Sequence, residues 1–365
     1  MDCPAPPYAA LKIEKGDDEG NLFEAISFIT GGISNALYKV APKADAGLAP
    51  VAFRIYGDNT ENFIDRKKEV ELMQLLQCHG FGPQLLGVFD TGRIEEFLKM
   101  RALSHEEMAS PQYAPIVART LRRFHSVQPQ GKQEVRTPFA RIYEWLDTAK
   151  EFRFEDPKKQ EEFEAFDLQR LRREVLRVER VCQRSKSPVV LAHNDLLCGN
   201  IMVPDQRGAG FEGPANGTCS SDGSSSSSGG GQEMTFIDFE YSEWAPRGFD
   251  IGNHFVEYGG YDCVSSLYPS QEQAERFLRH YLAGDSCGPD EVDAAELARC
   301  VAEVNAFALA SNMFWGTWCF LQASTDGAKW SSIDFDYLQY AQLKWGEYFK
   351  RRDAFLAAAE EAFLE

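Results

Sequence analysis

Two short apolar segments, each followed by an acidic residue, constrain this chain more than any other feature. Val189–Ala192 precedes a polar run that contains Asp195, and Met234–Ile237 runs directly into Asp238. Apolar runs of this length are typical of short buried strands. The pattern therefore predicts two strands that present carboxylates at their ends.

The spacing after the first strand indicates phosphoryl transfer from a nucleotide. Asp195 and Asn200 have the D-x4-N spacing of the protein-kinase catalytic loop. That chemistry needs a carboxylate to orient and deprotonate the attacking hydroxyl, and oxygen ligands for the magnesium that offsets phosphate charge. We therefore expect Asp195 to act as the catalytic base and Asn200 and Asp238 to bind Mg²⁺.

A Gly/Ser-rich tract lies between Asp205 and Glu233. Such a composition cannot build a core. Apolar segments at Asn200–Val203 and Met234–Ile237 flank the tract. We therefore expect a disordered loop at about residues 206–232 that joins two paired strands, rather than a linker between domains.

Residues 1–97 are expected to form a β-rich lobe that carries one helix. Apolar residues at helical spacing predict this helix over Asp65–Gln77. The strands expected around it are Ala36–Val40, Val51–Tyr56, Gln84–Phe89 and Arg93–Leu98.

Residues 98–365 are dominated by helical patterns. The expected helices are Pro111–Ser126, Glu161–Ser185, Glu272–Leu282, Glu291–Ser311 and Tyr337–Leu364. A run of strands followed by a run of helices favours an α+β protein, and the length allows two lobes or one large domain with insertions.

The charge of the chain excludes some classes of partner. The formal net charge is −18, which opposes binding to nucleic acids and to anionic membranes because both need a basic face. A cationic small molecule suits such a field better. No apolar run approaches the roughly 20 residues of a membrane span, so no stable membrane insertion is expected.

The cysteines and the N-terminal stretch indicate the compartment. The nine cysteines include no CxxC pair, so we expect reduced thiols and no zinc site. The N-terminal stretch is acidic and lacks a long apolar core, so it is not expected to be a signal peptide. These features predict a cytoplasmic protein.

Longer runs of sequence resemble the choline/ethanolamine kinase family. The run LAHNDLLCGNIM resembles its catalytic loop, and Ile237–Tyr258 (IDFEYSEWAPRGFDIGNHFVEY) resembles its signature sequence. The resemblance extends from GGISNALYK at Gly31 to the last helix around Tyr340–Tyr348. It implies a protein-kinase-like bilobal fold, ATP and Mg²⁺ in the cleft, and an amino alcohol in a pocket of the helical lobe.

The resemblance also implies roles for residues on the nucleotide side. A glycine-containing loop would cover the phosphates, since glycine permits close approach of backbone N–H groups. A strand arginine would pair with a helix glutamate, and a strap between the lobes would contact adenine. The residues matched are Gly31, Gly32, Ser34 and Asn35 in the loop, Arg54 and Glu69 as the pair, and Glu95 and Phe97 in the strap.

On the substrate side, the resemblance implies an aromatic pocket beside a braced catalytic loop. Aromatic faces attract an ammonium group through cation–π interaction. The pocket residues matched are Tyr241, Trp315, Trp318 and Tyr340, with Glu257 as a carboxylate, and the bracing residues are His193, Asn194, Asp250 and Asn253.

Two positions favour ethanolamine over choline as the acceptor. Leu197 stands where choline kinases generally carry glutamine, and one tyrosine of the choline pocket falls on Cys263. A pocket without one aromatic wall should hold a trimethylammonium group less well. We expect ethanolamine kinase activity, with choline kinase or dual activity as the alternative.

Two other functions share part of the pattern. An aminoglycoside-type phosphotransferase has the same acidic spacing, but the FDIGNHF run and the tryptophan pair argue against it. A non-catalytic kinase-like binding module would be expected to have lost Asp195, Asn200 or Asp238, and all are present. The sequence leaves open whether the chain is a monomer or a homodimer.

Overall fold

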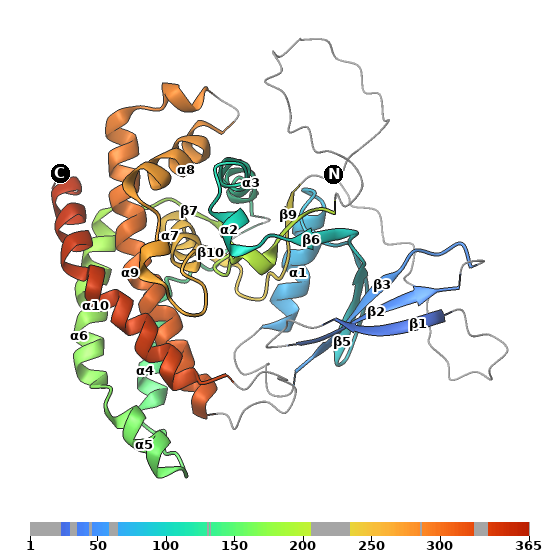
Figure 1. Cartoon of the computed structure of the whole chain (residues 1–365), viewed down its shortest axis with the longest axis horizontal. Helices are drawn as coiled ribbons and strands as arrows, with labels where there is room; N and C mark the ends of the chain where they lie inside the picture. The colour runs from blue at the N-terminus through green and yellow to red at the C-terminus, as the bar shows by residue number, and fades with distance from the viewer. Residues whose placement is uncertain are drawn as a thin grey trace.

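The chain folds into a sheet with one helix beside a larger, mostly helical part (Figure 1). The computed structural model describes residues 23–29, 35–43, 46–57, 65–129, 131, 133–205, 234–284, 287–324 and 335–364. The predicted α+β class with two lobes is confirmed.

The smaller lobe is built on an antiparallel sheet whose described strands lie in the order β1-β2-β3-β5-β4. Its strands are β1 (Phe23–Ile29), β2 (Asn35–Pro42), β3 (Val51–Tyr56), β4 (Leu85–Phe89) and β5 (Gly92–Glu96). The sequence did not predict β1. The register of β3 against β5 sets Arg54 directly opposite Arg93, so two cationic side chains share one place on the sheet.

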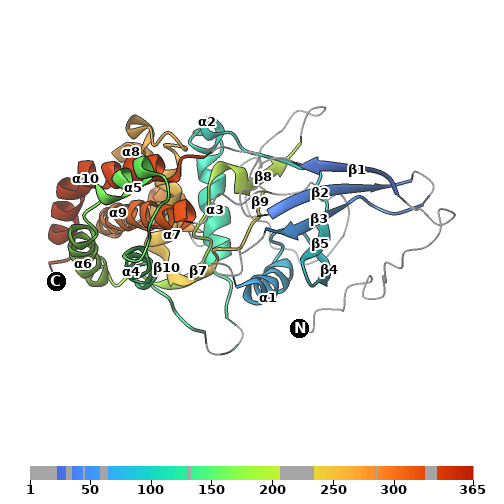
Figure 2. The same cartoon turned by 90° about the horizontal axis from the view of Figure 1, so that it is seen from below.

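Helix α1 (Arg66–Gln77) packs beside this sheet and forms as predicted (Figure 2). The Asp65 side chain caps it by accepting a hydrogen bond from the backbone N–H of Lys68 at 3.0 Å. Leu72 and Leu76 lie on its buried face, and Glu69 is buried there too. The helix therefore brings a carboxylate to the two arginines.

Two small ladders in the larger lobe carry the segments that contain Asp195 and Asp238. In one, β6 (Met100–Ala102), β8 (Ile201–Pro204) and β9 (Thr235–Phe236) form a sheet in the order β6-β8-β9. In the other, β7 (Val189–Ala192) pairs antiparallel with β10 (Glu243–Pro246). The predicted pairing of the strands around the Gly/Ser-rich tract is thus confirmed. The loop predicted at about 206–232 lies outside the described residues.

The described helices of the larger lobe surround a long central one, α9. In Figure 2, α3 lies between the other helices and the sheet. The helices are α2 (His105–Met108), α3 (Ala114–His125), α4 (Pro138–Ala149), α5 (Pro157–Glu164), α6 (Leu168–Arg184), α7 (Arg247–Glu257), α8 (Gln271–Ala283), α9 (Ala294–Ser324) and α10 (Tyr337–Ala362). None of the described helices combines the length and apolar character needed to cross a membrane.

Two predicted helices have wrong boundaries. The single helix predicted over Glu161–Ser185 is divided into α5 and α6, because Asp167 caps the second helix by accepting a hydrogen bond from the backbone N–H of Arg170 at 2.9 Å. The helix predicted over Glu291–Ser311 extends to Ser324. Its C-terminal half is buried on all sides, so it shows no helical periodicity of polar residues.

Candidate active site

Asp195, the predicted base, lies in the loop that follows β7. Asn200 donates hydrogen bonds from Nδ2 to the backbone oxygen of Asp195 at 2.8 Å and to its carboxylate Oδ2 at 3.2 Å. The backbone N–H of Leu197 donates to the same backbone oxygen at 3.0 Å. The amide of Asn200 thus turns its nitrogen toward Asp195 and leaves its oxygen for another partner.

Asp250, from α7, braces this loop. The backbone N–H groups of His193 and Asn194 donate to its two carboxylate oxygens at 2.6 and 2.7 Å. His125 Nε2 lies 2.8 Å from the same carboxylate. Burial, the largest single influence, would raise the pKa of Asp250, but the interactions with His125 and His193 together hold that pKa below its usual value. A charged carboxylate therefore fixes the backbone on which Asp195 stands.

Asp238 follows β9 and lies against the same loop. The backbone N–H of Ile237 donates to the backbone oxygen of Asn200 at 3.0 Å, and His193 Nε2 lies 3.0 Å from the backbone oxygen of Ile237. Asp238 itself has φ of +66°, an uncommon conformation for a residue with a side chain. The two predicted metal ligands, Asn200 and Asp238, thus come from neighbouring strand ends.

Acidic groups surround Asp195. Burial raises its pKa well above the usual value, and the charges of Glu257, Asp238 and Glu240 raise it further. A carboxylate in such surroundings stays ionised only when cations lie nearby. An ammonium substrate and a metal ion are cations of the kind that this site requires.

Arg54 and Glu69, predicted as an ion pair, do not contact each other directly. Arg54 Nε lies 3.2 Å from Glu95 Oε1, and its Nη1 lies 3.3 Å from Asp238 Oδ1. Glu69 instead pairs with Arg93 at 2.8 Å. The predicted pair is wrong because the β3–β5 register places a second arginine beside Arg54, and that arginine takes the helix carboxylate.

The surroundings of Glu95 therefore differ from those expected of a residue in the adenine strap. Its carboxylate accepts hydrogen bonds from both Arg54 and Arg93 and is buried. The chain that joins β5 to β6 is residues 97–99. Phe97 belongs to that strap, and Lys39 Nζ lies 4.4 Å from the centre of its ring.

Glu240 joins the two lobes. Its role was not predicted from the sequence. Asn35, at the start of β2, donates a hydrogen bond from Nδ2 to Glu240 Oε2 at 3.2 Å. Arg66 of α1 lies 3.5 Å from the same oxygen and donates to Asn35 Oδ1 at 3.0 Å. Of the predicted phosphate-covering loop, Asn35 is described, and the residues outside the described part are Gly31, Gly32 and Ser34.

Carboxylates gather where the two lobes meet. One oxygen each from Glu69, Asp238 and Glu240 lie within 4.8 Å of one another. Hard divalent cations such as Mg²⁺ take oxygen ligands, often one or two carboxylates together with substrate phosphates. The donor set at this point is all oxygen and negatively charged, so it fits such a cation.

Glu257, the predicted carboxylate of the ammonium pocket, is paired with Lys344 of α10. Lys344 Nζ lies 3.0 Å from Glu257 Oε1 and 5.1 Å from the centre of the Tyr340 ring. Burial alone would lower the pKa of the fully buried Lys344, but Glu257 and Tyr340 raise it well above its usual value. This lysine was not predicted from the sequence. The pair engages Oε1 and leaves Oε2 for a second cation.

The predicted aromatic residues of the pocket lie together. The Tyr241 and Trp315 ring centres are 5.1 Å apart, and those of Trp315 and Trp318 are 5.5 Å apart. Trp315 Nε1 donates to Asn253 Oδ1 at 2.7 Å, so the predicted bracing residue Asn253 orients a pocket ring. Asn194 Nδ2 donates to the backbone oxygen of Tyr241 at 3.0 Å. That bond ties the aromatic group to the catalytic loop.

Tyr261 stands close to the position where the sequence indicated a missing aromatic wall. Its ring centre lies 6.1 Å from that of Tyr340. Partial burial raises the pKa of Tyr261 to about 12, and the charges of Glu257 and Asp195 add to the shift, which places the ring near both groups. Cys263 lies two residues further on, with φ of +48°. Tyr261, which is 51% exposed, therefore presents an aromatic ring beside Tyr340.

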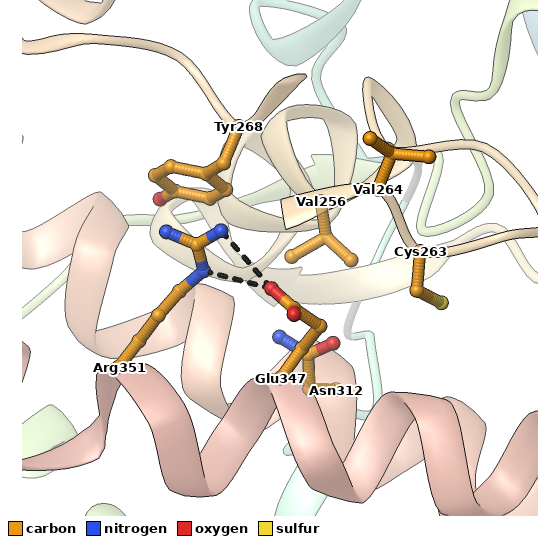
Figure 3. A pocket seen from close by; sticks show the side chains of 8 residues that line it. Val256, Cys263, Val264, Tyr268, Asn312, Glu347 and Arg351 are labelled. Carbon is orange, nitrogen blue, oxygen red and sulfur yellow. Dashed lines mark hydrogen bonds and ion pairs between the residues drawn. The ribbon is translucent and has the colours of Figure 1, made fainter. Parts of the chain in front are cut away.

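A small cavity lies behind this pocket and is too small for an amino alcohol (Figure 3). Its volume is about 20 Å³, which is room for about one water molecule. Figure 3 shows the Tyr268 ring against the guanidinium of Arg351, which donates to Glu347 at 3.0 Å. Cys263 and Asn312 border the same cavity. This cluster supports the loop that carries Tyr261.

A two-lobed fold with a D-x4-N loop, a second acid after a β-ladder and an oxygen cluster between the lobes defines a protein-kinase-like phosphotransferase. The family model for choline/ethanolamine kinase matches residues 26–349. The chain therefore belongs to the choline/ethanolamine kinase family. Membership of a kinase family implies ATP as the phosphoryl donor.

Relatives and solved structures agree with this assignment. The chain is 37% identical over 338 residues to an Arabidopsis thaliana protein named "Probable ethanolamine kinase", covering 92% of this chain and 82% of that protein. It is 30% identical to human "Choline/ethanolamine kinase", covering 89% and 79%. The structure of Plasmodium vivax ethanolamine kinase has a TM-score of 0.72 and 27% identity, covering 91% of this chain and 83% of that one.

Proposed function

We propose that this chain transfers the γ-phosphoryl group of ATP to the hydroxyl group of ethanolamine. The observation that carries the proposal is the position of Asp195, which contacts Asn200 and lies within the electrostatic influence of Glu257 and Asp238. A hydroxyl held at that point would have a base, an ammonium-binding carboxylate and metal ligands within reach.

In this mechanism Asp195 accepts a hydrogen bond from the substrate hydroxyl and takes its proton as the bond to phosphorus forms. General-base assistance of this kind contributes roughly 10²–10⁴-fold to a rate. Glu257 and the rings of Tyr241, Trp315, Trp318 and Tyr340 hold the ammonium group. The reaction needs no covalent intermediate on the protein, so positioning and charge stabilisation supply the catalysis.

Asn200 and Asp238 are the proposed ligands of Mg²⁺, with Glu240 beside them. The oxygen cluster of Glu69, Asp238 and Glu240 supports the assignment of Asp238. The Asn200 amide, whose nitrogen is engaged by Asp195, supports the assignment of Asn200. When bound, the ion would neutralise phosphate charge. Arg54 would supply a second positive charge to the phosphates.

Residues 1–97 are proposed as the nucleotide-binding lobe and residues 98–365 as the lobe that binds the amino alcohol. The loop residues Gly31, Gly32, Ser34 and Asn35 would cover the phosphates. The strap would contact adenine through the backbone near Glu95 and Phe97. The ion network around Glu69 would hold Arg54 in place rather than bind nucleotide itself.

Ethanolamine is the preferred acceptor in this proposal because of hydrogen bonding. A primary ammonium has three N–H donors, and Glu257, whose Oε1 pairs with Lys344, offers a carboxylate oxygen as an acceptor. Leu197 departs from the glutamine of choline kinases. The relative that is 37% identical carries the name ethanolamine kinase, which supports the same choice.

A dual choline/ethanolamine kinase is the second candidate. Tyr261, whose ring contacts Tyr340, provides an additional aromatic face, and aromatic faces hold a trimethylammonium group without hydrogen bonds. A relative that is 30% identical is named for both substrates.

A coupled ADP-release assay tests the proposal. We expect Mg²⁺-dependent ADP release with ethanolamine, and a kcat/KM that falls with each N-methyl group toward choline. Equal kcat/KM values for ethanolamine and choline would establish a dual enzyme. A clear choline preference would contradict the ethanolamine assignment, and no release with any member would contradict the catalytic proposal.

The product is phosphoethanolamine, and the proposed place of the enzyme is the first step of phosphatidylethanolamine synthesis by the nucleotide-activated route. We propose that it acts in the cytoplasm, where ATP and a water-soluble amino alcohol are both present.

A further inference from the structure

The loop that follows α1 touches the strand that ends at Asp238. Gly82 donates a hydrogen bond from its backbone N–H to Thr235 Oγ1 at 2.9 Å, and Thr235 belongs to β9. Gly82 has φ of +70°, in the left-handed region that favours glycine. The sheet lobe thus contacts the metal-binding strand through this loop.

Phe239, the residue after Asp238, packs directly on Gly82. A Cβ atom added at Gly82 would lie 2.7 Å from Phe239 Cε2 and 3.0 Å from Cζ. Carbon atoms in contact normally lie about 3.5–4.0 Å apart. No side chain fits at Gly82 unless the ring moves.

The Phe239 ring has little room to move. It is 2% exposed. It stacks on Phe124 with 6.0 Å between ring centres and meets His193 edge-on at 5.7 Å. His193 belongs to the loop that carries Asp195. Because protein interiors are close-packed, a displaced ring shifts its neighbours.

A displacement of Phe239 reaches Asp238 through one peptide unit. The φ of +66° at Asp238 is a conformation that persists only where its surroundings enforce it. The Asp238 carboxylate lies 3.3 Å from Arg54 Nη1, longer than the roughly 2.7–2.9 Å of a strong charge-assisted hydrogen bond. The packing of Phe239 is therefore a major restraint on this carboxylate.

We propose that Gly82 is a positioning residue for phosphoryl transfer. Its missing side chain lets Phe239 occupy the one place that aims the Asp238 carboxylate at the metal–nucleotide site. This inference rests on the proposed function, in which Asp238 binds Mg²⁺. Gly82 touches neither the substrate nor the metal and acts through Phe239.

Gly80 provides a matched control in the same loop. It has φ of +76°, and nothing lies within 4 Å of a Cβ atom added there. Alanine at either position carries the same kind of backbone strain. Both glycines border one cavity of about 330 Å³, so the two variants alter the same loop. The difference between the two alanine variants isolates the contact with Phe239.

The experiment compares Gly82→Ala and Gly80→Ala in the full-length chain by two measurements. One is the Mg²⁺ concentration for half-maximal ADP release with ethanolamine. The other is the rise in melting temperature caused by ATP with and without Mg²⁺. We expect Gly82→Ala to raise the Mg²⁺ requirement about tenfold, as a small misplacement of a catalytic group does. Gly82→Ala should also lose the Mg²⁺-dependent part of the rise in melting temperature that ATP causes. Gly80→Ala should match the wild type in both measurements.

A Phe239→Leu background supplies a second comparison, which also serves if Gly82→Ala does not fold. Leucine lacks the ring atoms that a Cβ at residue 82 would meet. Adding Gly82→Ala to Phe239→Leu should therefore leave the Mg²⁺ requirement unchanged. The proposal is overturned if the two alanine variants behave alike, or if Gly82→Ala raises the requirement equally in both backgrounds.

The melting-temperature measurement does not depend on the acceptor. If the wild type released no ADP with ethanolamine but the melting shifts separated the alanine variants as expected, the ethanolamine assignment would fall and the role of Gly82 would stand. If ADP release were normal and the shifts identical, only the role of Gly82 would be lost.

Discussion

At the scale of single residues, Asp195 is the group on which the chemistry depends most. Asparagine in its place keeps the shape and the hydrogen bond with Asn200 but cannot take a proton. We expect Asp195→Asn to lower kcat by roughly 10²–10⁴-fold, while the rise in melting temperature with MgATP remains.

The matched control for this variant is Asp262→Asn, because Asp262 is exposed on the loop beside Tyr261. It should keep nearly wild-type kcat. A loss in Asp195→Asn no larger than that in the control would remove Asp195 from the role of base.

Lys344 is a fully buried residue whose loss should cost stability. In Lys344→Met, Glu257 is left as a buried carboxylate without its partner at 3.0 Å. Breaking a buried pair from one side costs about 3–5 kcal/mol, whereas replacing both members is often close to neutral. We expect Lys344→Met to lower the free energy of unfolding by that amount, and Lys344→Met with Glu257→Gln to regain most of it.

Urea unfolding of both variants and of the single variant Glu257→Gln would measure this coupling. If the double variant were as unstable as Lys344→Met, the lysine would act through packing of its aliphatic chain rather than through its charge.

At the scale of elements, the sequence predicted segments with a clear period and missed those without one. The helix over α1 has apolar residues at helical spacing and a capping aspartate, and it formed as predicted. The end of α9 is apolar on every side, so Trp315 and Trp318 could be matched to a pocket but not placed on a helix. Periodicity reports a polar face, and a fully buried helix has none.

Among the candidate site residues too, those with a clear pattern in the sequence were predicted and those without one were missed. Asp195, Asn200 and Asp238 have a local spacing that reports their chemistry. No such spacing indicates the roles of Arg93 and Lys344, because their partners Glu69 and Glu257 come from other elements. The alternation of Arg93 and Glu95 on one face of a strand is the signal that could have predicted the buried ion network.

The pairing of β8 with β9 makes the intervening tract expendable. Ile201 lies opposite Phe236 and Met202 opposite Thr235 in an antiparallel ladder, so a short turn can replace the residues between them. We expect deletion of Gly208–Gly231, with a short turn joining the ends, to leave kcat and both KM values within about twofold, because connections of a few residues suffice between antiparallel strands. Loss of soluble, active protein would show that the tract is structural.

At the scale of the whole molecule, contacts across the lobes form the proposed nucleotide side of the site. Arg54 of the sheet lobe reaches Asp238, and Asn35 reaches Glu240. Neither lobe alone holds the cationic and acidic groups that a metal–nucleotide complex needs. The proposed substrate pocket, in contrast, lies within the helical lobe, with Tyr241 from the segment before β10 and the other residues from α7, α9 and α10. The two substrates therefore experience different parts of the charge distribution.

The net charge of −18 should make the two substrates respond oppositely to salt. The carboxylates around Asp195 attract an ammonium ion, whereas the acidic surface repels MgATP, with Arg54, Arg66 and Arg93 offsetting that repulsion locally. Raising the ionic strength from about 0.01 to 0.1 M shortens the Debye length from about 30 to 10 Å. We expect KM for ethanolamine to rise a few-fold and KM for MgATP to stay level or fall.

Steady-state kinetics with each substrate varied in turn would measure this, with Glu257→Gln as the variant in which the rise for ethanolamine is reduced. A parallel rise of both KM values would mean that salt acts on the lobe interface instead, by screening the contacts that hold Asp238 and Glu240 to the sheet lobe.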